Sequence, residues 1–175
     1  MESYSESIGK FAVNLRLADV PPAVIEKAKL VFLDTMGVAL ASSTMDFGAM
    51  VTKVAKTLGG APASLIIGSR HRVAAANAVI ANGTLAHGLD YDDTLEEAIV
   101  HTGSCAWMTA FAVAEETAAN GRALLESAIV GTEVLCKVGL VALIAIRIDQ
   151  LIIPIRMTIL TESRYMCPRQ REFRC

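Results

Sequence analysis

The feature that most constrains the fold is a long run of apolar residues with helical spacing between residues 22 and 40. Its members recur every three or four positions as Ile25, Ala28, Phe32, Met36 and Ala39, and Val24, Val31 and Val38 widen the apolar face. A stripe this broad indicates a helix that packs against several neighbours. Pro21-Pro22 marks its start, because proline is tolerated in the first helical turn.

The same periodicity recurs along most of the chain and predicts about six helices, an all-α, bundle-like domain. Ser3 and Glu6 form a capping-box signature before the first helix. Asp46 is expected to cap the third helix and Ser104 the fifth, while Gly59-Gly60 ends the third. Further helices are expected over about residues 73–89 and 123–139. Residues 63–67 form either a small strand or an extended connector.

Composition excludes several classes of function. The chain has 175 residues, enough for one domain with a sizeable core, and its net charge of −2 offers no basic field for nucleic acid. Its longest apolar run, residues 138–146, is too short to span a membrane. The polar N-terminus resembles no targeting signal, and the four cysteines form no CxxC pair. We therefore expect a cytoplasmic protein with reduced thiols.

The most unusual stretch follows the fourth predicted helix. Residues 90–97 contain five carboxylates, Asp90, Asp92, Asp93, Glu96 and Glu97, and His87 and His101 flank them. Carboxylates this close repel one another, a cost that marks a functional site unless the stretch is simply a solvated acidic loop. His101 precedes the next predicted helix, where the helix N-terminus could receive an anion. The cationic groups that we expect to lie nearby are Arg70, His71, Arg72 and His101.

Three chemical interpretations compete for this stretch. A calcium loop fails, because its sixth position is Leu95 rather than glycine and its twelfth is His101 rather than glutamate. Residues 92–96 fit the DDxxE pattern of magnesium-dependent isoprenoid enzymes, but a companion metal motif is missing. Acid–base chemistry on a carboxylated substrate is the third interpretation. In it His101 transfers a proton, Asp90 orients His101 or shares the proton, and the Thr94 hydroxyl binds a substrate oxygen.

A family resemblance favours the third interpretation. AHGLDYDDT followed by HTGS, with the VPPAVIEKAKLVFLDTMGVALA helix and the GTEV stretch, resembles the MmgE/PrpD family over roughly residues 5–140. That family includes 2-methylcitrate dehydratase and cis-aconitate decarboxylase. The resemblance places the family's active-site Asp, Thr and His on Asp90, Thr94 and His101. The Asp-to-His spacing is one residue longer than in the decarboxylase pattern, and Thr102 stands where the family usually has proline.

The resemblance also implies what such a chain does. Full-length members join an all-helical domain to a smaller α/β lid, form homodimers, and work without a metal or organic cofactor. They act on small polycarboxylates by dehydration, decarboxylation or epimerisation, and 2-methylcitrate dehydration belongs to propionate metabolism. We therefore expect a carbon–oxygen lyase of the 2-methylcitrate dehydratase type, without membrane or nucleic-acid partners.

Composition changes near the C-terminus. Residues 147–175 contain no Ala, Gly or Lys but six arginines. We therefore divide the chain into a partial MmgE/PrpD-like helical domain, residues 1–140, and a divergent, poorly ordered tail, residues 141–175. This division suggests a truncated member of the family, lacking its second histidine and lid lysines. The alternative is a catalytically dead helical fragment that associates with other copies of itself.

Overall fold

The computed structural model describes residues 3–146, which contain six α-helices and one two-stranded sheet. The helices are α1 (Tyr4–Asn14), α2 (Pro22–Ser42), α3 (Asp46–Leu58), α4 (Ala75–His87), α5 (Met108–Glu116) and α6 (Gly121–Ile146). Short helical segments η1 (Leu17–Asp19) and η2 (Gly103–Trp107) precede α2 and α5. The prediction of an all-α domain with about six helices is confirmed. Helix α6 includes residues 141–146 of the predicted tail, and the remainder of that tail lies outside the described residues.

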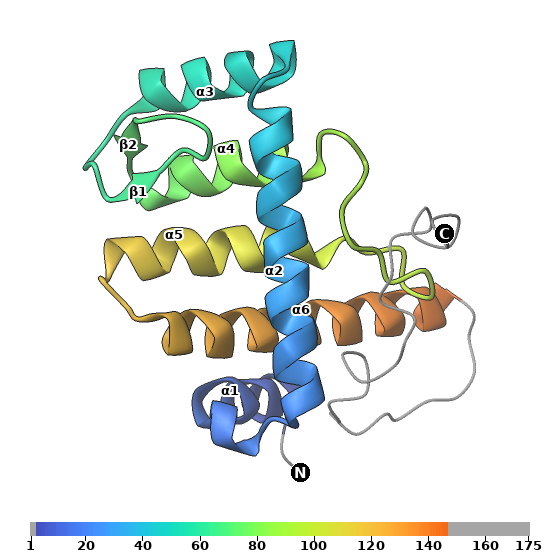
Figure 1. Cartoon of the computed structure of the whole chain (residues 1–175). Helices are drawn as coiled ribbons and strands as arrows, with labels where there is room; N and C mark the ends of the chain where they lie inside the picture. Colours follow the sequence, from blue (N-terminus) through green and yellow to red (C-terminus); the bar gives the residue numbers. More distant parts are fainter. Residues whose placement is uncertain (1–2, 147–175) are drawn as a thin grey trace.

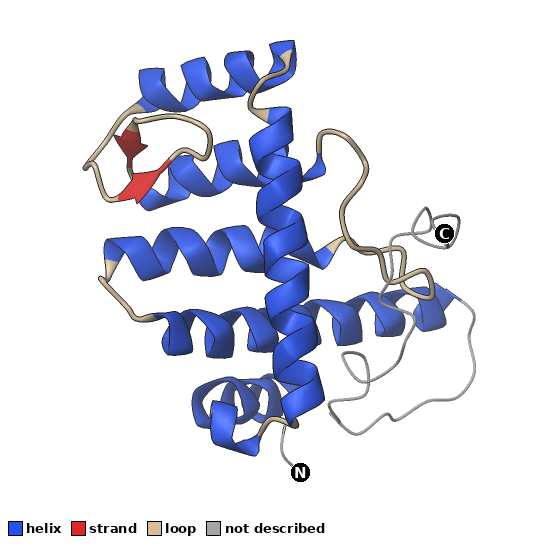
Figure 2. Cartoon of the chain, viewed as in Figure 1, coloured by secondary structure: helices blue, strands red, loops and turns tan. Residues whose placement is uncertain are grey.

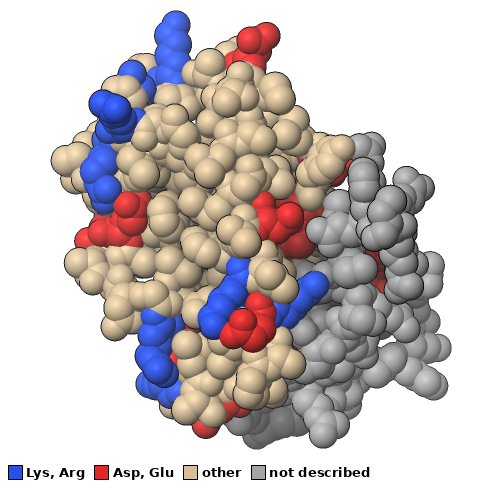
Figure 3. Space-filling view, in the orientation of Figure 1, with Lys and Arg blue, Asp and Glu red and all other residues tan. Residues whose placement is uncertain are grey.

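Helix α2 crosses a stack formed by α3, α4, α5 and α6, whose neighbours pack against one another (Figures 1 and 2). It begins at Pro22, as predicted, and buries a face that includes Val24, Ala28, Val31 and Ala39. The exposed residues of α2 include the ion pair of Glu26 and Lys29 as well as apolar side chains. Figure 3 shows mostly uncharged atoms on this side of the molecule, with small groups of charged atoms among them. No helix among residues 3–146 is both long and apolar enough to cross a lipid bilayer.

Small side chains allow the stacked helices to approach closely. Helix α4 buries alanines at positions 75, 78, 81 and 86, and α5 buries alanines at 110, 112 and 114. The aromatic contribution to this core is concentrated at one point, where the Phe32 and Trp107 rings stack with their centroids 5.3 Å apart.

The predicted signals at helix ends are mostly confirmed. Ser3 and Glu6 form the capping box on α1, and Gly59 ends α3 with a positive φ of 62°. The predicted cap at Asp46 is wrong: Asp46 is the first residue of α3, Met45 precedes it as the cap, and no side chain bonds there.

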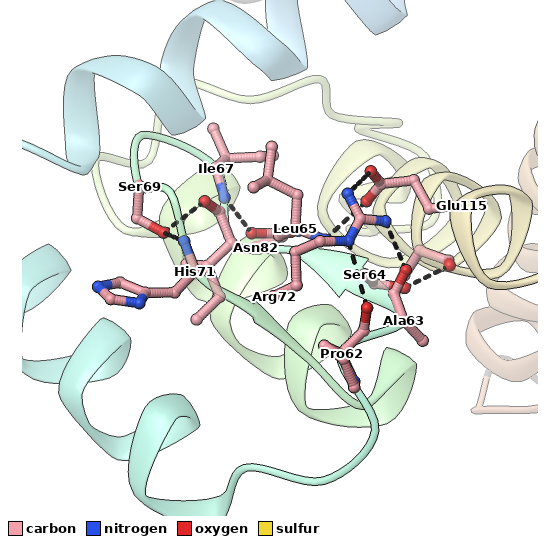
Figure 4. A network of polar contacts seen from close by, with 12 residues as sticks. Pro62, Ala63, Ser64, Leu65, Ile67, Ser69, His71, Arg72, Asn82 and Glu115 are labelled. Carbon is pink, nitrogen blue, oxygen red and sulfur yellow. Dashed lines mark hydrogen bonds and ion pairs between the residues drawn. The ribbon is translucent and has the colours of Figure 1, made fainter.

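A small hairpin lies between α3 and α4, with β1 (Ser64–Leu65) antiparallel to β2 (Arg72–Val73). The buried Asn82 side chain of α4 binds this hairpin through two hydrogen bonds. Its amide accepts from the Ile67 N–H at 2.9 Å and donates to the Leu65 carbonyl at 2.9 Å (Figure 4). Glu115 of α5 accepts from the Leu65 N–H and pairs with the Arg72 guanidinium at 3.0 Å. Residues 63–67 are thus partly a strand, held to the stack by polar contacts.

Replacing Asn82 with alanine should lower the free energy of unfolding by about 2–4 kcal/mol, because it leaves two buried backbone groups without partners. Urea denaturation followed by helical circular dichroism would measure the loss. Asn77→Ala is the matched control, since the half-buried Asn77 amide makes one hydrogen bond, to the Gly59 carbonyl. Equal losses in the two variants would contradict this account of the hairpin.

Candidate active site

Residues 88–101, which we call the acidic loop, connect the end of α4 to η2 and α5. They lie at the end of the helix stack opposite the hairpin (Figure 1). A single bridge between Leu95 and Val100 folds the loop back on itself, with the Leu95 N–H donating to the Val100 carbonyl at 3.0 Å. Asp90 and Ile99 take positive φ values of 53° and 52°, a conformation that Asp tolerates better than most residues.

Asp92 is the centre of the loop's polar contacts. Its side chain is fully buried, and both of its carboxylate oxygens lie 3.1 Å from the Nδ1 atom of His87. The Nδ1 atom of His101 lies 3.4 Å from the Asp92 Oδ1 atom. The two imidazole rings are therefore neighbours, with centroids 4.7 Å apart. One buried carboxylate orients two histidines that come from the two ends of the loop.

The three residues predicted from the sequence come together around this centre. The Thr94 hydroxyl lies 3.2 Å from the His101 Nδ1 atom. The Asp90 carboxylate belongs to a group, with His87, Asp92 and His101, whose potential ligand atoms all lie within 4.8 Å of one another. Asp90, Thr94 and His101 thus share one small region, and their individual roles remain predictions.

Sequence reasoning assigned no role to His87 or Asp92, although it noted both. Asp92 was one of five similar carboxylates, and only the folded loop distinguishes it as the buried one that contacts the two histidines. His87 occupies the last turn of α4, a position where a helix favours a cationic side chain. The spacing of five residues between His87 and Asp92, across the turn that follows α4, is the sequence signal that could have predicted their contact.

Asp93 corrects two expectations about the helix that follows. Its carboxylate accepts from the Thr102 hydroxyl at 2.6 Å and from the Gly103 N–H at 2.8 Å. Asp93 therefore caps the start of η2, while the predicted cap, Ser104, lies inside η2 and donates to the His101 carbonyl. The helix N-terminus that we expected to receive a substrate anion already holds this carboxylate.

A second expectation concerns positive charge near the acidic loop. Arg70, His71 and Arg72 belong to the hairpin, which contacts the middle of α4 through the hydrogen bonds of Asn82 to Ile67 and Leu65. The Arg72 guanidinium pairs with Glu115 of α5 and not with the acidic loop. His101, in contrast, lies beside Asp92 and Thr94.

The negative charge of the acidic loop affects the pKa of a residue on helix α2. Partial burial raises the pKa of the Asp34 carboxyl on α2, and the carboxylates of Asp93 and Asp92 raise it further, while Lys27 acts in the opposite direction. The fold therefore brings Asp34, from a helix far away in the sequence, close to the carboxylates of the acidic loop.

A groove lined by other residues lies elsewhere. It measures about 650 Å³ and is lined mainly by small and apolar side chains of α1, α5 and α6. None of His87, Asp90, Asp92, Thr94 and His101 lines it. The acidic loop is therefore separate from this groove. In the loop region His87 and Asp90 are exposed, His101 is half-buried and Asp92 is buried. Its imidazole and carboxylate atoms are also the groups that could hold a metal ion.

Gly103→Ala should destabilise the chain by about 1–3 kcal/mol, because a Cβ there would overlap the Asp93 carboxylate and lie 2.6 Å from the Thr35 hydroxyl. Gly37→Ala in α2 is the matched control, since no atom lies within 4 Å of the added Cβ. The control should gain roughly 0.5–1 kcal/mol from better helix propensity. Thermal unfolding of both variants tests this, and an unchanged Gly103→Ala would remove the role given to Asp93.

Asp34→Asn should stabilise the chain at neutral pH, because asparagine avoids the cost of ionising a partly buried carboxyl beside Asp93 and Asp92, a cost that raises the pKa of Asp34. This gain should shrink as the pH falls through the raised pKa, and vanish below the ordinary carboxyl pKa, where Asp34 is protonated in both the folded and unfolded states. Urea denaturation at several pH values measures it. Glu26→Gln on the same helix, where Glu26 pairs with Lys29, should show no such gain.

Comparison with known families agrees with the fold and the motif. The model of the MmgE/PrpD N-terminal domain matches residues 6–150, which is most of the chain and extends ten residues beyond the expected boundary at 140. No curated protein matches the chain at a significant level. Because the match covers α2 to α6, most of α1 and the acidic loop, the chain belongs to the MmgE/PrpD family.

Proposed function

We propose that the chain is a lyase of the 2-methylcitrate dehydratase type, which acts on a small di- or tricarboxylate by acid–base catalysis. The observation that carries this proposal is the grouping of His101, Thr94 and Asp90 around the buried Asp92 carboxylate. Membership of the MmgE/PrpD family supports it. The reaction needs a base that removes a proton next to a carboxylate and an acid that protonates the departing β-hydroxyl.

His101 is the residue proposed to move the proton. Its Nδ1 atom faces Asp92 and Thr94, which hold the ring in one orientation. Imidazole is the side chain that most often transfers protons in acid–base catalysis. Asp90 would orient His101 or share its proton, and the Thr94 hydroxyl would bind a substrate oxygen.

The proposed substrate is negatively charged, and so is the acidic loop. A polycarboxylate needs cationic or hydrogen-bonding partners, yet residues 87–101 contain five carboxylates and neither lysine nor arginine. Within that segment, cationic character can come only from His87 and His101 in their protonated forms. Protonation of both imidazoles would partly offset the carboxylates and give a substrate oxygen a favourable place to bind.

His101→Ala should reduce turnover about 10²–10⁴-fold, the usual cost of removing a general acid–base group. The assay follows the ultraviolet absorbance of the alkene formed from 2-methylcitrate, with cis-aconitate as the decarboxylation substrate. His71→Ala is the matched control, because His71 is exposed on the hairpin loop and should retain full activity. A His101→Ala variant as active as wild type would end the assignment of His101.

A second candidate is a helical module that associates with copies of itself and performs no catalysis. The exposed face of α2 favours it, because Leu30, Leu33 and Leu40 are 61%, 69% and 50% exposed on one side of the helix. Apolar faces of this kind are typical of protein–protein contacts. Wild-type chain without turnover of either substrate would favour this candidate over the lyase. Homodimer formation is compatible with both.

A further inference from the structure

The acidic loop contains the ligand set of a transition-metal site. His87, Asp90, Asp92 and His101 each offer one nitrogen or carboxylate oxygen, and these four atoms lie within 4.8 Å of one another. Two imidazoles with carboxylates form a donor set that suits zinc and similar divalent ions. Two of the donors, Asp92 and His101, are held in place by their surroundings, and His87 is held by Asp92.

The distances fit coordination as well as hydrogen bonding. Bonds of about 2.0–2.2 Å to zinc in a tetrahedral site place neighbouring ligand atoms about 3.4 Å apart. The His87 Nδ1 atom lies 3.1 Å and the His101 Nδ1 atom 3.4 Å from the same Asp92 oxygen, Oδ1. Asp90 is exposed, so a change of its side-chain rotamer can complete the fourth position.

The local charge favours a cation. Residues 87–101 carry five carboxylates without a lysine or arginine, and Asp92 places its share of that charge in a buried position. The raised pKa of Asp34 reports the same negative field from outside the loop. Asp93 is already engaged by Thr102 and Gly103, which leaves Asp92 as the buried carboxylate directed at the two histidines.

We propose that His87, Asp90, Asp92 and His101 bind one divalent transition-metal ion of the zinc class. The ion replaces the protons that the imidazoles share with Asp92, and so it acts as a competitor of proton transfer and not as a cofactor. The binding itself stands on the geometry of the four residues. Its inhibitory consequence rests on the function proposed above, because the ion would occupy the nitrogen of His101 that faces Asp92.

Titration of the full chain with Co²⁺ tests the site, since this ion takes zinc sites and its visible spectrum reports the ligands. We expect one saturable site per chain with a nitrogen and oxygen ligand spectrum. His87→Ala and His101→Ala should each weaken binding at least about tenfold, in line with the loss of a ligand or its support. His71→Ala is the matched control and should bind as wild type does.

Three outcomes would overturn the proposal: no saturable binding, affinity unchanged in both histidine variants, or the intense near-ultraviolet band of a cobalt–thiolate bond, which would assign the ion to cysteine. His87→Ala is expected to fold, because the His87 side chain is 51% exposed. It therefore tests the site more safely than a substitution of the fully buried Asp92 would. Saturable binding in a chain without lyase turnover would retain the metal site and remove the proposed function. Turnover without binding would do the reverse.

Discussion

The contact on which the site depends is the pair of hydrogen bonds from Thr102 and Gly103 to the Asp93 carboxylate. These bonds join the middle of the acidic loop to the start of the next helix. Asp92 and Thr94 flank Asp93 in the sequence, and His101 precedes Thr102. The bonds of the Asp93 carboxylate therefore bring His101 close to Asp92 and Thr94. Gly103 has no side chain because the Asp93 carboxylate and the Thr35 hydroxyl occupy that space. The positions of the reactive groups therefore follow from a capping interaction.

The loop manages its crowded charge in two different ways. The N-terminal dipole and free N–H groups of a helix stabilise Asp93, whereas the two imidazoles that contact Asp92 compensate its carboxylate. Asp34 shows that this compensation is incomplete, since its pKa is raised in part by the same two residues. A site with residual negative potential attracts protons and cations, and both the proposed proton transfer and the proposed metal binding draw on it.

Much of this arrangement could be predicted from local patterns. The capping box at Ser3, the proline start of α2 and the glycine end of α3 are short-range signals, and each is confirmed. The proximity of Asp90 to His101 was also expected, from a motif and its spacing. The caps at Asp46 and Ser104 were predicted wrongly, because a suitable residue at a helix start does not cap when another group already satisfies the backbone or the helix begins earlier.

The amino-acid sequence alone determined the helical class, the number of helices, the family and the segment that carries the chemistry, because each is written in residues close together along the chain. Only the tertiary structure decided which of five carboxylates is buried between two histidines, which one caps a helix, and that Arg72 pairs with Glu115 and not with the acidic loop. Carboxylates are chemically equivalent in a sequence, and they become different only when the packing of helices assigns each one its own partners and exposure to water.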